Sequence, residues 1–240
     1  MKKFILFLLA TSVFIWSCQK PHPVKDDGQK DSHCRIVTLI WSLSQDTFHI
    51  TYNNSGKISK VETEESVSNF EYAGNRITKT TSVLGVLREI KNITVNAAGL
   101  ATNVRTEEMD GAGTWRNEAY QYNGEEVSSA VLSYSGTNYT NTITYTWQNH
   151  NMVEVKNSIS PAVLELQYYT DKARQDGDYS LSLHKMLLGY EVLRCSNLLK
   201  SSGGMVYQYD FDTEGKIVAV EYTEPGNRSP IFMKYEYECK

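Results

Sequence analysis

Acidic side chains near the end of the chain have the spacing of a calcium-binding loop. In the stretch DFDTEGKIVAVE, Asp210, Asp212 and Glu214 fall at the first, third and fifth positions of an EF-hand. Gly215 and Glu221 fall at the sixth and twelfth positions. An EF-hand also needs a helix on each side, whereas VYQY before the loop and IVAVEY after it alternate as strands do. The three acids are the candidate metal ligands, but we interpret the stretch as a hairpin turn and expect neither a metal site nor a cofactor.

The remaining residues that could do chemistry do not form a known constellation. None of the five histidines has the spacing of a zinc ligand, and His184, inside an apolar segment, is expected to be a hydrogen-bonded core residue. Neighbouring acids such as Glu64 and Glu65 would point to opposite faces of a strand. The chain contains no nucleophile elbow and no phosphate-binding glycine loop. We therefore expect no enzyme. The alternatives left open are a glycan-active hydrolase that pairs carboxylates across strands, and a carrier of an apolar ligand.

The amino terminus predicts export and a lipid anchor. Lys2 and Lys3 precede an apolar run from Phe4 to Trp16, which is too short to span a bilayer as a helix and is typical of a signal peptide. Cys18 follows at once, and IWSC resembles the lipobox of bacterial lipoproteins. We predict a signal peptide over 1–17, lipidation of Cys18, a flexible tether over 18–33 and a single β-repeat domain over 34–240.

Composition limits the possible partners. The formal net charge of −4 and the lack of a basic patch exclude nucleic acid as a partner. The 16 tyrosines suit either a glycan-binding surface or simply the strands, in which tyrosine is a favoured residue. We expect a monomer that is tied to the membrane by its lipid and whose partner is a glycan or an envelope protein.

One hairpin unit recurs along the chain at intervals of roughly 25 residues, which is the signature of a repeat architecture. Each copy has an alternating strand, a short polar turn with glycine or asparagine, and a second strand, as in FHITYNNSGKISKVE and MVYQYDFDTEGKIVAVE. After the turn, the apolar residues Ile58 and Val61, like Ile217 and Val220, are three apart. This spacing indicates either a bulge or a sheet covered on both faces.

These units predict an all-β fold. We expect a large antiparallel meander of roughly twelve or more strands, curved into a barrel or half-barrel, with two packed sheets as the alternative. The segment from about 180 to 200 breaks the rhythm and is apolar, with the helical spacing of Leu183, Met186, Leu187 and Tyr190. We expect a short helical or irregular insert that packs on the inner face of the sheet.

Three cysteines remain after Cys18: Cys34, Cys195 and Cys239. Cys34 begins the first predicted strand and Cys239 ends the last, so a closed sheet would bring them together. The sequence leaves open whether any two of the three form a disulfide.

The order LHKMLLGY, SNLLKSS, YDFDTEGKI resembles the carboxy-terminal part of a family of uncharacterised Bacteroidota lipoproteins with a porin-like β fold, and the hairpins resemble tyrosine-aspartate repeats. The resemblance implies a fold and a compartment but no activity. We therefore expect a non-catalytic outer-membrane lipoprotein that acts as a binding or envelope-structural module, on an undecided face of that membrane and with an unknown ligand. The residues that match the family are His184, Leu187, Leu188, Gly189, Ser196, Asn197, Leu198, Tyr207, Tyr209, Asp212 and Gly215.

Overall fold

The computed structural model describes residues 34–179, 183–224, 226 and 229–239. The predicted signal peptide, Cys18 and the tether lie outside the described residues. Within the described ranges, no helix is long and apolar enough to cross a bilayer.

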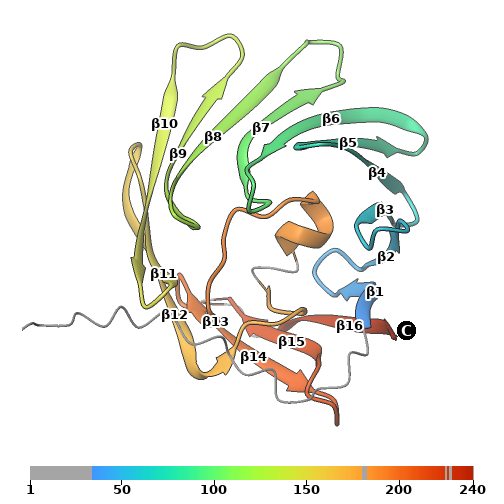
Figure 1. The fold of residues 1–240 in the computed structure, drawn as a ribbon, viewed down its shortest axis with the longest axis vertical. Helices are drawn as coiled ribbons and strands as arrows, with labels where there is room; N and C mark the ends of the chain where they lie inside the picture. Colours follow the sequence, from blue (N-terminus) through green and yellow to red (C-terminus); the bar gives the residue numbers. More distant parts are fainter. Residues whose placement is uncertain (1–33, 180–182, 225, 227–228, 240) are drawn as a thin grey trace, which may run out of the picture. The chain divides into compact units, whose positions relative to one another are not determined.

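Residues 34–239 form a closed antiparallel barrel in which every strand pairs with the next one in sequence and β16 pairs with β1 (Figure 1). The prediction of an all-β meander curved into a barrel is confirmed, and the sheet closes rather than stopping at a half-barrel. The described residues contain sixteen strands, more than the minimum of twelve that we expected. The strands are β1 Cys34–Trp41, β2 Asp46–Tyr52, β3 Ile58–Glu62, β4 Ser66–Ala73, β5 Arg76–Val83, β6 Val86–Val95, β7 Ala101–Glu108, β8 Trp115–Asn123, β9 Glu126–Tyr134, β10 Thr140–Gln148, β11 Asn151–Asn157, β12 Ser160–Ala173, β13 Asn197–Ser202, β14 Met205–Phe211, β15 Ile217–Thr223 and β16 Ile231–Cys239.

The two faces of the strands differ in polarity. In β16, Ile231, Met233 and Tyr235 are buried, whereas the alternate residues Lys234 and Glu236 are exposed. β14 has the same alternation. The buried side chains join one apolar cluster inside the barrel, so the apolar face of the sheet points inward and the charged face points to solvent.

A β-bulge explains the spacing of three between apolar residues. Opposite Thr51 and Tyr52 lie Lys60 and Ile58, so Ser59 is an extra residue in β3. The bulge lets Ile58 and Val61 both face the core. The hairpins β6–β7, β8–β9, β10–β11 and β14–β15 have the same register shift beside their turns. The extra residue bonds back across the hairpin through its hydroxyl where it is serine or threonine: Ser59 to Thr51 O, Thr102 to Thr94 O and Ser128 to Gln121 O, each at 3.2 Å.

These five bulges lie at one end of the barrel, which we call the bulge rim. This end comprises the turns β2–β3, β4–β5, β6–β7, β8–β9, β10–β11 and β14–β15, the segment that joins β12 to β13, and the barrel's two terminal residues, Cys34 and Cys239. An aromatic side chain near this rim donates a hydrogen bond to a carbonyl of the preceding strand in six hairpins. The pairs are Tyr52 to Ile36, Tyr72 to Ile58, Tyr122 to Ala101, Trp147 to Val127, Tyr209 to Leu199 and Tyr237 to Ile217, at 2.7, 2.8, 2.7, 2.7, 2.8 and 2.8 Å.

The segment between β12 and β13 enters the barrel, as Figure 1 shows in orange, and it contains one π-helical turn, η1 Leu183–Leu188. Met186, Tyr190 and Val192 are buried among the barrel residues, which confirms that the insert packs on the inner face. Beyond η1, Ala101 N donates to Glu191 O at 2.8 Å, so the segment also bonds to a strand at the bulge rim. The side chains of Leu183 and His184 lie outside the described structure.

A disulfide between Cys34 and Cys239 joins the first and last strands. The two residues are directly opposite each other in the β1–β16 ladder. Cys195, in the insert, is buried and has a free thiol. The pairing that the sequence left open is therefore between the two ends of the barrel.

Candidate functional site

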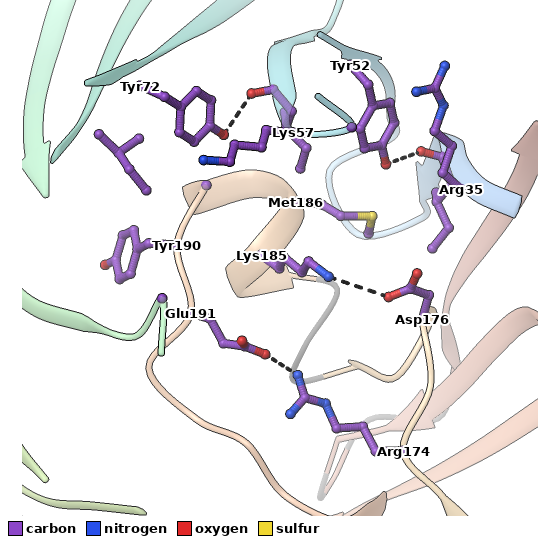
Figure 2. Close-up of a pocket in the computed structure, with 16 residues that line it drawn as sticks. Arg35, Tyr52, Lys57, Tyr72, Arg174, Asp176, Lys185, Met186, Tyr190 and Glu191 are labelled. Atoms are coloured by element: carbon purple, nitrogen blue, oxygen red, sulfur yellow. Dashed lines mark hydrogen bonds and ion pairs between the residues drawn. The ribbon is translucent and has the colours of Figure 1, made fainter. Parts of the chain in front are cut away.

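A cavity of ≈ 320 Å³ lies at the bulge rim between the insert and strands β1 to β5. We call it the rim cavity. Figure 2 shows that cationic, acidic and tyrosine side chains converge on it from the barrel wall and from the insert. It is lined by Arg35, Ile36, Tyr52, Gly56, Lys57, Ile58, Tyr72, Ile77, Gly99, Arg174, Asp176, Lys185, Met186, Gly189, Tyr190 and Glu191.

Two of the rim hydrogen bonds fix the tyrosine wall of the rim cavity. Tyr52 and Tyr72 donate their hydroxyls to main-chain carbonyls of β1 and β3 (Figure 2). The guanidinium carbon of Arg35 lies 4.6 Å from the ring centre of Tyr52, and Lys57 Nζ lies 4.9 Å from that of Tyr72. Burial, aided by the charge of Asp176 and opposed by Arg35, raises the pKa of Tyr52 to about 12. These tyrosines are therefore neutral framework residues that position two cations.

Ion pairs hold the acids of the rim cavity. Glu191 pairs with Arg174 and also with Arg194, whose Nε is 2.9 Å from the carboxylate. Lys185 Nζ lies 3.9 Å from Asp176, and both side chains are exposed. The lining carries Arg35, Lys57, Arg174 and Lys185 against Asp176 and Glu191, so cations outnumber acids.

A glycine allows the insert to approach the wall. Gly189 has a φ of +78°, which L side chains rarely adopt, and a Cβ at this position would overlap the ring of Phe70. On the other side of the insert, Arg194 Nη2 donates to Ala98 O at 2.7 Å and its Nη1 pairs with Glu125 at 3.1 Å. The insert is thus bound to the turns β6–β7 and β8–β9.

Of the three candidate metal ligands, Asp212 and Glu214 lie in the β14–β15 hairpin turn, and Asp210 is an exposed residue of β14. Oδ1 of Asp212 accepts hydrogen bonds from the amides of Glu214 and Lys216, each at 2.9 Å. Asn53 Oδ1 accepts two amides in the equivalent turn, each at 3.0 Å, so an uncharged side chain does the same work. Lys216 Nζ lies 3.4 Å from Asp212 and 2.6 Å from Glu214. In the part of the chain that the structure describes, no three His, Cys, Asp or Glu side chains are grouped as metal ligands.

The hydrolase alternative needs two acids in a cavity, and the acids of the rim cavity, like Glu118 on the inner wall, each have a partner. Glu118, on β8, accepts a hydrogen bond from Tyr120 and pairs with Arg116 at 3.0 Å. Asp176 and Glu191 are paired as described above. Cys195 lies 3.2 Å from the Tyr168 hydroxyl, and burial raises the pKa of its thiol. The paired cations and acids of the rim cavity can bind and neutralise charged groups of a ligand.

The sequence did not predict the cations of the rim cavity. Arg35, Lys57, Arg174 and Lys185 come from a strand, a turn and two parts of the insert, so no local spacing joins them. The regular hairpin unit was the available signal, because it places a turn residue such as Lys57 at the bulge rim.

The fold defines a class, a closed β-barrel with an internal segment, and the fold is similar to that of solved structures. A porin-like protein from Bacteroides uniformis matches with a TM-score of 0.60 and 16% identity, over 85% of this chain and 95% of that one. A porin-like protein from Bacteroides vulgatus matches with a TM-score of 0.56 and 16% identity, over 85% of this chain and 98% of that one. No family model and no curated protein matches the sequence. At this identity the likeness establishes a porin-like β fold, whereas lipidation and membership of the lipoprotein family stay predictions.

Proposed function

We propose that this protein is a non-catalytic lipoprotein of the outer membrane whose barrel is a ligand-binding module and not a pore. The observation that carries the proposal is the insert, which fills part of the lumen with its own side chains. Met186 and Tyr190 are 5% and 6% exposed and belong to the same apolar cluster as the barrel wall. A water-filled channel needs a polar, open interior, and this interior is largely apolar and packed.

The polarity of the outward-facing residues favours a barrel that lies beside the bilayer. The positions that alternate with the buried ones in β14 and β16 include Gln208, Asp210, Lys234 and Glu236, which are exposed. Membrane-spanning barrels have the opposite alternation, with an apolar band outside. The membrane link in this proposal is the diacylated Cys18 that the sequence predicts.

The rim cavity is the proposed ligand site. Its excess of cations favours a ligand with an acidic group, and its mixture of tyrosine edges and polar side chains suits a sugar ring. We therefore propose an acidic glycan of the envelope as the ligand class. A carrier of an apolar ligand would need an aliphatic lining, and Arg35, Lys57 and Arg174 do not provide one.

The anchor and the lack of a pore are tested together. Palmitate labelling should be lost in Cys18→Ala and kept in the control Cys195→Ala. The lipidated protein in planar bilayers should give no conductance above that of lipid alone. Stepwise single-channel conductance would overturn the proposal, as would unchanged labelling of Cys18→Ala.

The ligand class is tested by calorimetry with a uronic-acid disaccharide and its neutral counterpart. We expect the acidic sugar to bind more tightly and Lys57→Gln to weaken that binding, whereas Lys60→Gln, which removes a cation paired with Glu62, should not. Equal binding of both sugars, or no effect of Lys57→Gln, would remove the acidic glycan from consideration.

A further inference from the structure

A row of polar residues crosses five strands of the inner wall. In the strand register, Lys79 of β5 lies opposite Lys91 of β6. Lys91 lies opposite Thr106 of β7, and Thr106 lies opposite Arg116 of β8. Tyr134 of β9 follows opposite Arg116. The row faces the lumen, because Lys79 Nζ donates to the carbonyl of Leu187 in the insert at 2.9 Å.

These polar groups are buried to an extent that is unusual for their types. Lys79, Lys91 and Thr106 are 7%, 4% and 2% exposed. The hydroxyl of Thr106, which lies between Lys91 and Arg116 in the row, has no hydrogen-bond partner among the described residues. A buried hydroxyl without a partner costs free energy, so a polar group that is added at this place would be stabilising.

A second cavity of ≈ 210 Å³, which we call the lumen cavity, adjoins the row. Lys91, Arg116 and Glu118 line its polar side. Tyr145 from the wall and Leu188 from the insert line its other side. The Arg116 side chain is 45% exposed, so the cavity lies beside solvent. Its volume equals that of about seven water molecules, which suits a small organic molecule.

The charges of this region leave a surplus of one cation. Lys79, Lys91 and Arg116 face two acids: Glu89, 3.5 Å from Lys91, and Glu118, 3.0 Å from Arg116. A buried charge is stabilised by a counter-charge, and one negative charge would balance this set. A dianion would exceed the surplus and would also meet the two carboxylates.

We propose that the lumen cavity binds a small organic monocarboxylate, with its carboxylate between Lys91 and Arg116 and its apolar body against Tyr145 and Leu188. This site lies against β6, β8 and β10, whereas the rim cavity lies against β1 to β5. It takes a different ligand, so it stands independently of the acidic-glycan proposal.

The electrostatics of the row agree with this site. Burial, followed by repulsion from Lys91 and opposed by Glu89, lowers the pKa of Lys79 to about 8. Two lysines therefore compete for charge in one low-dielectric region, and an anion beside Lys91 would relieve that repulsion.

The test is calorimetric titration with benzoate, benzyl alcohol and inorganic phosphate as probes. We expect benzoate to bind, and benzyl alcohol and phosphate to bind at least tenfold more weakly, a difference of about 1.4 kcal/mol. Comparable binding of benzyl alcohol would make the cavity a site for neutral ligands, and tighter binding of phosphate would make it a phosphate site. Either result overturns the proposal, as does the absence of benzoate binding at millimolar concentration.

Variants locate the site. Lys91→Met keeps the volume of the side chain and removes its charge, so the protein should fold and bind benzoate at least tenfold more weakly. Arg116→Gln, at a half-exposed position, should have the same effect if Lys91→Met fails to fold. Lys156→Met, an exposed lysine paired with Glu154, is the matched control and should bind as the wild type does. Glu118→Gln should bind benzoate at least as tightly. Unchanged benzoate binding in both Lys91→Met and Arg116→Gln overturns the proposal.

Discussion

At the scale of single residues, the tyrosines near the bulge rim are framework residues whose hydroxyls satisfy main-chain carbonyls. Tyr122→Phe removes only the hydroxyl, which donates to Ala101 O at 2.7 Å. We expect the free energy of unfolding to fall by about 1 kcal/mol, because the carbonyl loses a partner inside the barrel. Urea denaturation measures the change. Tyr139→Phe, at a side chain that is 48% exposed, is the control and should be neutral, and an equal effect of both variants would contradict this role.

Lys79 predicts a pH dependence of stability. Its pKa is about 8 in the folded barrel and is near its ordinary value of 10.5 in the unfolded chain. Between these values the unfolded state binds more protons, so stability rises with pH and the destabilising contribution is fully present below pH 8. From pH 7 to pH 9.5 the gain is on the order of 2 kcal/mol.

The measurement for Lys79 compares urea denaturation of the wild type and Lys79→Met at both pH values. Lys91 and Glu89, the charged groups that influence Lys79, are present in both proteins, so the difference isolates Lys79. The gain between pH 7 and 9.5 should be smaller in Lys79→Met by that amount. If both proteins respond equally to pH, Lys79 does not have a lowered pKa.

Single residues also show where sequence reasoning succeeds. The alignment of Asp212 with Asn53 predicted a turn, and both side chains accept two amide hydrogen bonds in the structure. The row of polar residues on the inner wall was not predicted. Lys79, Lys91 and Thr106 lie on three strands, and their register depends on the bulges and turns between them.

At the scale of elements, the insert depends on one glycine. Gly189→Ala combines an unfavourable positive φ with overlap between the new Cβ and the Phe70 ring. We expect a loss of about 2 to 4 kcal/mol in the free energy of unfolding. Gly74→Ala is the matched control, because Gly74 also has a positive φ but open space around its Cβ position, so it should lose about 1 kcal/mol. Thermal or urea denaturation of both variants measures the difference, and equal losses would show that the contact with Phe70 is unimportant.

Other features of the elements could not be predicted from the sequence alone. The spacing of three residues in β3 and β15 pointed to a bulge or to double coverage, and the register shows the bulge. Residues 197–200 were assigned to the insert but belong to β13. The consecutive residues Leu198 and Leu199 are both buried, so this strand lacks the alternation that identifies a half-buried strand.

At the scale of the whole barrel, closure depends on contacts between the two ends of the domain sequence. Cys34 and Cys239 are opposite each other, and the Arg35 guanidinium lies 2.7 Å from the Glu238 carboxylate. Repeated hairpins predict that a sheet curves, but each unit is the same in an open or a closed sheet. Whether the first strand meets the last depends on strand number and stagger, which local patterns do not encode.

The disulfide gives closure a measurable energetic role. A crosslink across a sequence separation of 205 residues restricts the unfolded chain strongly, whereas the β1–β16 ladder can form without it. We therefore expect Cys34→Ser/Cys239→Ser to fold into the same barrel with a free energy of unfolding that is lower by about 2 to 5 kcal/mol. Reduction of the wild type should reproduce this loss and should leave the double variant unchanged. Cys195→Ser, which removes the buried free thiol, should keep the full response to reductant. If reduction leaves the wild type as stable as before, the hydrogen bonds and core contacts of the seam alone account for closure, and the disulfide has no part in it.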